Sequence, residues 1–262
     1  MDYLAERMVP ISLDEFLAAR RNGAALPRRA VLITFDDGER SVYEVGLPML
    51  RDRGLSGVVF VVAGLLDTTQ PFWWSEVREL AEQGGETREF AHVQALDLPR
   101  KLKNVGNHKR RSAIEDLRAS ARMPASPEPQ LRRAEMLKLE AAGIAVGNHT
   151  LTHPCLNKCD RITVQNEIAQ AHDLLTNALG HAPRAFAYPD GAWTETAAQT
   201  AVSLGYEAAF IFDHRHATWP PADPMRISRL RVNSHTTDDR FRIILSGLHP
   251  FLHRARTVVA GN

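Results

Sequence analysis

The sequence has little cysteine, little net charge and no long apolar run. Its 262 residues include two cysteines, too few for a disulfide framework, which favours a reducing compartment. The 32 basic and 31 acidic side chains nearly cancel, so the overall charge does not indicate nucleic acid or an anionic membrane as a partner. No stretch approaches a membrane span, and residues 1–29 contain no apolar core of the signal-peptide type. We therefore predict a soluble, cytoplasmic protein, although a secreted protein shortened at its leader would look the same.

The order of apolar runs and helical patterns predicts an α/β fold. A chain of this length suits one large domain or two small ones. Short apolar runs alternate with amphipathic segments, which is typical of a parallel sheet with helical crossovers. The runs expected to form strands are 31–35, 57–62, 144–146, 185–188, 207–212 and 230–232. At least six strands separated by helices predict a closed or nearly closed barrel.

Two of the expected helices have clear sequence signatures. Ser12 and Glu15 have the spacing of a capping box, and that helix should end near Gly23. A second helix is expected after the first strand, where apolar residues recur at helical spacing. These residues are Val42, Val45, Met49 and Leu50.

The alternation stops between about residues 70 and 130. This segment has no strand pattern, and we interpret it as a helical insertion within a single domain spanning 1–262. Trp73 and Trp74 are either core residues or a platform for stacking sugar rings. The basic side chains form either a solvated helix face or a docking site for anionic substrate groups. They are Arg100, Lys101, Lys103, Lys109, Arg110 and Arg111.

Carboxylates and imidazoles follow the expected strands. Asp36 and Asp37 end the first strand, and two adjacent carboxylates are costly to ionise unless a cation or a proton separates them. His149 and His153 are four residues apart and follow another strand. Two imidazoles and one carboxylate are the ligand set of a catalytic zinc ion. An ordinary turn and a packed histidine pair are the alternatives, but strand ends of a parallel barrel converge on the face where catalytic groups collect.

Three motifs resemble one known family. Residues 34–38 (Thr-Phe-Asp-Asp-Gly), 149–153 (His-Thr-Leu-Thr-His) and 186–191 (Phe-Ala-Tyr-Pro-Asp-Gly) are similar to those of the polysaccharide deacetylases, carbohydrate esterase family 4 with its NodB homology domain. The third motif is similar to the Phe-Ala-Tyr-Pro branch. The resemblance covers about residues 30–247, apart from the insertion, and implies a distorted (β/α) barrel.

The resemblance also implies a metal site. Asp37, His149 and His153 would hold a divalent metal, zinc first, with Co²⁺ or Ni²⁺ as alternatives. Asp36 would be the general base, and a backbone N–H near Asp190 would stabilise the oxyanion.

Other residues follow from this comparison or depart from it. Thr150 and Thr152, between the two histidines, would orient the histidines by hydrogen bonds or cap the loop that carries them. Many family members have an arginine where Ala187 stands, and Arg229 would take over its contact with the base. Tyr188 is expected to pack beneath the metal. Cys155 and Cys159 are either two buried or loop thiols or part of a second metal site.

The family's late Leu-x-His, whose histidine protonates the leaving amine, is not recognisable. His214, His216 and His235 lie in the corresponding third of the chain. The expected activity is removal of N-acetyl groups from an N-acetylated sugar or polysaccharide. The alternatives are a deformylase, or a deacetylase of a small or lipid-linked glycoside, and a carbohydrate-binding protein that has lost turnover.

Overall fold

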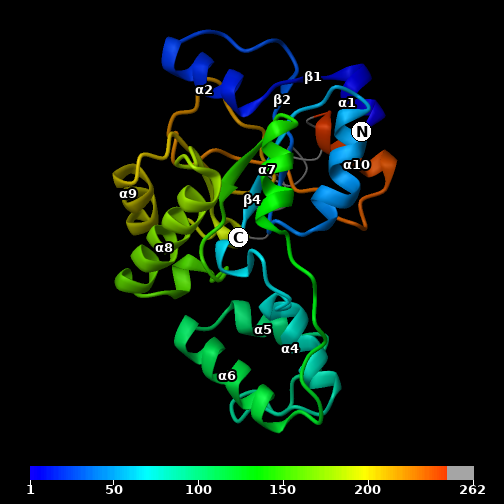
Figure 1. Cartoon of the computed structure of the whole chain (residues 1–262), viewed down its shortest axis with the longest axis vertical. Coiled ribbons are helices and arrows are strands. Elements are labelled where there is room, and N and C mark those ends of the chain that lie inside the picture. Colours follow the sequence, from blue (N-terminus) through cyan, green and yellow to red (C-terminus); the bar gives the residue numbers. More distant parts are fainter. Residues whose placement is uncertain (247–262) are drawn as a thin grey trace, which may run out of the picture.

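The protein is built around an open sheet of five parallel strands, in the order β3-β4-β5-β6-β7. A computed structural model describes residues 1–246 (Figure 1). The strands are β3 (Thr34–Phe35), β4 (Gly57–Val61), β5 (Ile144–Asn148), β6 (Ala185–Ala187) and β7 (Ala208–Phe210). Because neighbouring strands are parallel and follow one another in chain order, their carboxyl ends share one edge.

The first predicted strand is divided between two sheets. β2 (Ala30–Val31) pairs with β1 (Val9–Pro10) in a separate two-stranded parallel sheet, whereas β3 pairs with β4. Leu32 and Ile33 join the two pieces. The run therefore changes its hydrogen-bonding partner before it reaches Asp36, which its apolar pattern alone does not reveal.

The last predicted strand, 230–232, does not form. The edge beyond β7 carries an isolated bridge between Phe210 and Ile227, and Arg231 and Val232 lie exposed outside any strand. Without a strand there, the sheet formed by residues 1–246 is an open barrel of five strands and not the closed or nearly closed barrel of at least six strands that we predicted.

Helices connect and cover the strands (Figure 1). The α-helices of residues 1–246 are α1 (Asp2–Arg7), α2 (Leu13–Asn22), α3 (Leu47–Arg51), α4 (Trp73–Glu82), α5 (Leu98–Lys103), α6 (Asn107–Ser120), α7 (Arg133–Ala141), α8 (Arg161–Leu179), α9 (Glu195–Ser203) and α10 (Asp238–Leu245). Short segments are the π-helix η1 (Val42–Gly46) and the 3₁₀ turns η2 (Ala63–Leu65), η3 (Leu156–Lys158) and η4 (Pro189–Gly191). Within residues 1–246, no helix has both the length and the apolar character needed to cross a membrane.

The two helices with sequence signatures have different outcomes. The capping box of Ser12 and Glu15 begins α2, which ends at Gly23 with a positive φ of 62°, as predicted. In the second helix, Val42 and Leu50 are buried, but Val45 and Met49 are 57% and 39% exposed. This helix starts as η1, and a π-helical turn contains more residues than an α-helical turn. The 3.6-residue spacing therefore does not hold along it.

The core lies on both faces of the sheet. β4 is buried throughout, and its side chains alternate between two apolar clusters, with Val59 and Val61 on one face and Val58 and Phe60 on the other. The first cluster includes residues of α7 and α8, and the second includes residues of α2. A strand covered on both faces reads as a continuous apolar run, as 57–62 does.

The segment between β4 and α7 folds as helices. α4, α5 and α6 share an apolar cluster of their own, built around Val77, Leu80, Leu102 and Leu117. Figure 1 shows them as a lobe below the sheet. Their side chains reach the carboxyl edge of the sheet at the site described next.

Candidate metal centre

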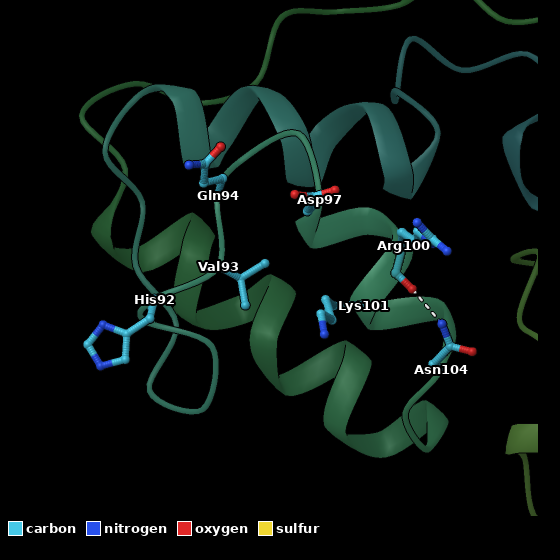
Figure 2. Close-up of a pocket in the computed structure, with 7 residues that line it drawn as sticks. All are labelled: His92, Val93, Gln94, Asp97, Arg100, Lys101 and Asn104. Carbon is cyan, nitrogen blue, oxygen red and sulfur yellow. Dashed lines mark hydrogen bonds between the residues drawn. The ribbon is translucent and has the colours of Figure 1, made fainter.

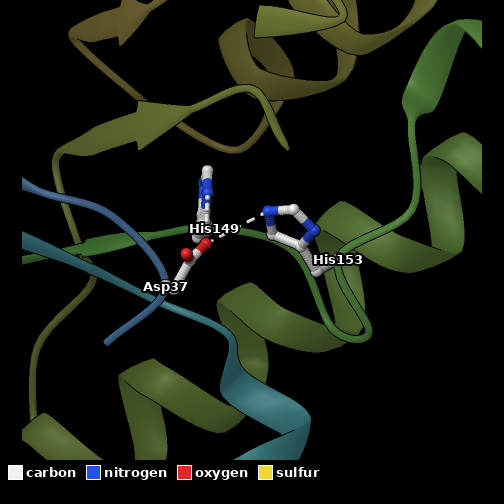
Figure 3. Close-up of side chains that lie close together, drawn as sticks. All are labelled: Asp37, His149 and His153. Carbon is white, nitrogen blue, oxygen red and sulfur yellow. Dashed lines mark ion pairs between the residues drawn. The ribbon is translucent and has the colours of Figure 1, made fainter. Parts of the chain in front are cut away.

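Asp37, His149 and His153 converge at the carboxyl edge of the sheet. One ligand atom from each lies within 4.8 Å of the others. Asp37 Oδ1 is 3.4 Å from His149 Nε2 and 3.2 Å from His153 Nε2 (Figure 3). Donor atoms held tetrahedrally at zinc-ligand distances of about 2.0–2.1 Å are roughly 3.3 Å apart. The spacing of these three donors therefore fits a shared cation.

The loops that carry the ligands have strained backbones. Asp37, Thr150 and His153 have positive φ values of 71°, 70° and 55°. Non-glycine residues rarely adopt this region, and such strain gathers at functional sites. Hydrogen bonds hold the turn: the Thr150 N–H donates to Asn148 Oδ1, and the His153 N–H donates to Thr150 Oγ1.

His149 is oriented by the sheet. Its Nδ1 lies 2.7 Å from the carbonyl oxygen of Ala187 in β6, so Nδ1 carries a proton and Nε2 is the nitrogen that faces Asp37. Burial lowers the pKa of His149, but the hydrogen bond to Asp37 and the charges of Asp36 and Asp37 outweigh it and raise the pKa overall. His153 has no such contact, because its Nδ1 is buried without a hydrogen-bond partner.

Asp37 is an ionised carboxylate with a partly exposed side chain. Burial alone would raise its pKa. Hydrogen bonds with the two imidazoles lower the pKa by more than burial raises it, so the pKa of Asp37 lies well below its usual range. Its side chain is 29% exposed, whereas those of His149 and His153 are nearly fully buried. The group thus has two imidazole nitrogens, one anionic carboxylate oxygen and a side open to solvent.

The two cysteines do not add a second such group. Cys155 and Cys159 are free thiols, and burial raises their pKa values to about 11 and about 12. Both thiols are therefore protonated at neutral pH. In the chain as far as residue 246, the one cluster with metal-ligand geometry is that of Asp37, His149 and His153.

Arg229 contacts Asp36 through both ends of its guanidinium group. Nη1 donates to Asp36 Oδ1 at 2.7 Å and Nη2 donates to Oδ2 at 2.8 Å. The same group also donates to Thr34 Oγ1 and to the carbonyl oxygen of Ile211, which fixes its plane. Burial raises the pKa of Asp36, but the charges of Arg229 and His149 outweigh that effect and keep the pKa low.

Asp190 is tied to the helical lobe. Its φ is 52°, Lys103 of α5 donates to its Oδ1 at 2.7 Å, and the Cys155 thiol donates to its Oδ2. The basic residues of the lobe have two outcomes. Lys103 pairs with Asp190 and Arg110 is buried at 5% exposure. The others are exposed, as expected of a solvated helix face, and are Arg100, Lys101, Lys109 and Arg111.

Other predicted residues have mixed outcomes. Tyr188 is fully buried, and its hydroxyl donates to the carbonyl oxygen of Met225. Its place beneath a metal stays a prediction. Burial raises the pKa of Tyr188, so it remains protonated. His216 and His235 lie exposed in the segment after β7, and His214 is half-buried there.

Glu167 on α8 supports the site and was missed. Its carboxylate accepts hydrogen bonds from the backbone N–H groups of Leu151 and Thr152 and from the Thr152 hydroxyl. A signal was present in the sequence, since Glu167 lies between Val164 and Ile168 on the apolar face of the predicted helix, where a carboxylate needs a specific partner.

A separate hollow of about 760 Å³ lies on the lobe (Figure 2). It contains none of the three residues Asp37, His149 and His153, and is lined by His92, Val93, Gln94, Asp97, Arg100, Lys101 and Asn104. Most of these side chains are exposed, and the hollow provides no converging set of buried polar groups.

The fold and the site define a parallel α/β protein with a carboxylate–imidazole group of metal-ligand geometry where strand ends converge. The sequence model of the polysaccharide deacetylases matches residues 23–95 and 102–209, more than half of the chain. The chain belongs to the polysaccharide deacetylase family.

Individual proteins resemble parts or most of the chain. A chitooligosaccharide deacetylase of Bradyrhizobium sp. (strain ANU 289) is 34% identical over 82 residues, 31% of this chain and 36% of that protein. One of Sinorhizobium fredii is 31% identical over 105 residues, 36% of this chain. The chain thus spans about a third to a half of the length of these relatives, 36% and 47%.

A solved structure extends the comparison to nearly the whole fold. The deacetylase PplD of Streptococcus pyogenes, solved in complex with acetate, matches with a TM-score of 0.63 at 18% identity. The match covers 93% of this chain and 83% of that one. This likeness confirms the predicted fold class, a distorted (β/α) barrel, here with an open sheet.

Proposed function

We propose that this chain is a divalent-metal-dependent hydrolase that removes N-acetyl groups from an N-acetylated sugar or polysaccharide. The observation that carries the proposal is the meeting of Asp37, His149 and His153 beside the Asp36–Arg229 pair. Membership in the family and the relatives named chitooligosaccharide deacetylase support the substrate class.

In this proposal, Asp37, His149 and His153 hold the cation, with Zn²⁺ as the preferred metal because two imidazoles and a carboxylate suit it. A bound divalent cation supplies Lewis-acid activation of water and of the amide carbonyl. The Nδ1 contact of His149 with Ala187 supports this assignment, since it leaves Nε2 as the nitrogen available to a metal.

Asp36 acts as the general base. It accepts a proton from the water whose oxygen bonds to the acetyl carbon, and the carbon–nitrogen bond then breaks. The protonated Asp36 returns that proton to the nitrogen as the carbon–nitrogen bond breaks, so that a free amine and acetic acid leave, and the acid ionises to acetate in solution. The bidentate contact with Arg229 supports the role, because it fixes the carboxylate and keeps it ionised before the reaction.

Asp190 contributes its backbone N–H to the developing oxyanion, and the Lys103 contact with its side chain holds the loop. We further propose that residues 1–262 form one catalytic domain in which 70–130 is an insertion. A cytoplasmic location remains a prediction.

The test is acetate release from N-acetylglucosamine and its oligomers in the presence of Zn²⁺ or Co²⁺. Asp36→Asn should retain metal and lose roughly 100-fold or more in turnover. The exposed Asp52→Asn is the matched control and should behave as the unaltered chain. Formate release from N-formyl substrates would favour the deformylase alternative. Binding of saccharides without any acetate or formate release would contradict the proposal and favour a carbohydrate-binding protein.

A further inference from the structure

The two histidines of the metal centre are held in different ways. His149 is anchored through its ring, by the contact of Nδ1 with Ala187 in the sheet. The ring of His153 has no equivalent anchor, because its Nδ1 is buried without a hydrogen-bond partner. Its backbone also has a positive φ of 55°, a conformation that an L-residue adopts only when its surroundings hold it there.

The helical lobe supplies the contacts that His153 lacks from the sheet. The indole Nε1 of Trp73, on α4, donates to the carbonyl oxygen of His153 at 3.1 Å. Nη1 of Arg110, on α6, donates to the same oxygen at 3.1 Å. The ring of Trp74 packs edge-on against the imidazole, with 4.7 Å between the ring centroids.

Arg110 is unusual among the basic residues of the lobe. It is 5% exposed, and its guanidinium group lies 4.7 Å from the centre of the Trp73 ring. Burying a charged group is costly, and its Nε has no hydrogen-bond partner. A buried guanidinium aimed at one backbone oxygen has a specific task, and that oxygen belongs to a residue of the metal-binding group.

We infer that Arg110 and Trp73 are positioning residues that hold His153 in the orientation needed to bind a metal. They fix the His153 peptide plane, and with it the direction of the Cα–Cβ bond from which the imidazole projects. The helical lobe is then part of the metal centre, although it contributes no ligand. This inference rests on the proposed function, because it takes Asp37, His149 and His153 as the metal ligands.

The test is titration of the metal-free full-length chain with Co²⁺, whose visible absorption reports ligand geometry. Arg110→Met removes the donors and should weaken Co²⁺ binding roughly 10- to 100-fold. Trp73→Phe removes one donor but keeps a ring, and should weaken binding roughly tenfold. Arg110→Lys should restore part of the affinity. Arg111→Met, at the exposed neighbour on α6, should bind as the unaltered chain does.

The melting temperature of each metal-free variant is measured beside the titration. A merely structural role would lower the melting temperature without changing the Co²⁺ affinity or the absorption spectrum. Unchanged affinity in folded Arg110→Met and Trp73→Phe would overturn the inference. If Arg110→Met does not fold, unchanged affinity in Trp73→Phe has the same meaning. If the unaltered chain binds no Co²⁺, the metal site itself fails, and this inference with it.

Discussion

Asp36 and Asp37 are adjacent in the chain but have different partners. Arg229 occupies both oxygens of Asp36, while Oδ1 of Asp37 faces the two imidazoles. Two carboxylates can thus remain ionised side by side, one beside a fixed cation of the protein and the other in a group suited to a metal.

Replacing Arg229 tests this division of roles. Arg229→Lys keeps a positive charge but cannot reproduce two parallel hydrogen bonds to one carboxylate. We expect the metal content to stay unchanged and turnover to fall roughly 10- to 100-fold. Steady-state kinetics with metal analysis on the same samples measures both. The exposed Arg231→Lys serves as the control. A variant that lost its metal with its turnover would contradict separate roles for the two carboxylates.

At the level of elements, the ligand loop between β5 and α8 is fixed from several directions. Asn148 and Glu167 bind its backbone N–H groups, and η2 approaches it closely. The N–H of Gly64 donates to the Leu151 carbonyl oxygen at 3.0 Å. A Cβ on Gly64 would lie 2.5 Å from that oxygen, so only glycine fits between η2 and the loop.

Gly64→Ala should therefore displace the ligand loop. We expect a loss of about 1–3 kcal/mol in the free energy of unfolding and weaker metal binding. Urea unfolding and Zn²⁺ titration measure the two effects. Gly46→Ala is the matched control, because Gly46 has helical φ and the nearest atom to an added Cβ is 3.6 Å away. Equal stability and equal affinity in both variants would show that the close approach is not required.

The contact between α7 and the loop after Asp37 gives a pH-dependent stability. Arg40 donates to Glu135 at 2.8 Å, and the Arg132 N–H donates to the other carboxylate oxygen. Burial raises the pKa of Glu135, but these hydrogen bonds outweigh it and lower the pKa overall. A carboxyl whose pKa is lower in the folded state adds stability above its unfolded pKa of about 4.3, and this stability is lost as pH falls through the folded pKa.

Glu135→Gln should accordingly cost about 2 kcal/mol at neutral pH, and the difference from the unaltered chain should shrink in acid, where both side chains are uncharged. Urea unfolding of the two proteins across the acidic range measures it. A difference that stayed constant with pH, or grew in acid, would refute the assignment of the effect to this carboxylate.

For the molecule as a whole, the sequence predicted the central strands of the sheet better than the segments at its two edges. The runs at 57–62 and 144–146 are covered on both faces, and such strands can be predicted from the sequence because they form continuous apolar runs. The segment 230–232 (Leu-Arg-Val) alternates as a half-buried strand would but has no neighbouring strand to pair with, and no local pattern reports that absence in residues 1–246. The division of 31–35 between two sheets likewise depends on partners distant in the chain.

The candidate site shows the same limit. Asp37, His149 and His153 could be found because each follows a strand and their chemistry matches. Arg110 and Trp73 could not, since their contact with His153 spans 43 and 80 residues and joins a lobe whose own sequence is ordinary for helices. The sequence alone does not distinguish one buried arginine from the exposed basic residues beside it.

The central claim is that three side chains from two distant loops bind one divalent cation. Native mass spectrometry of the full chain after Zn²⁺ loading tests it most directly, with Asp37→Ala and Asp36→Asn beside the unaltered protein. We expect one Zn²⁺ per chain in the unaltered protein and in Asp36→Asn, and loss of that ion in folded Asp37→Ala. Equal zinc content in all three proteins, or none in any of them, would contradict the claim.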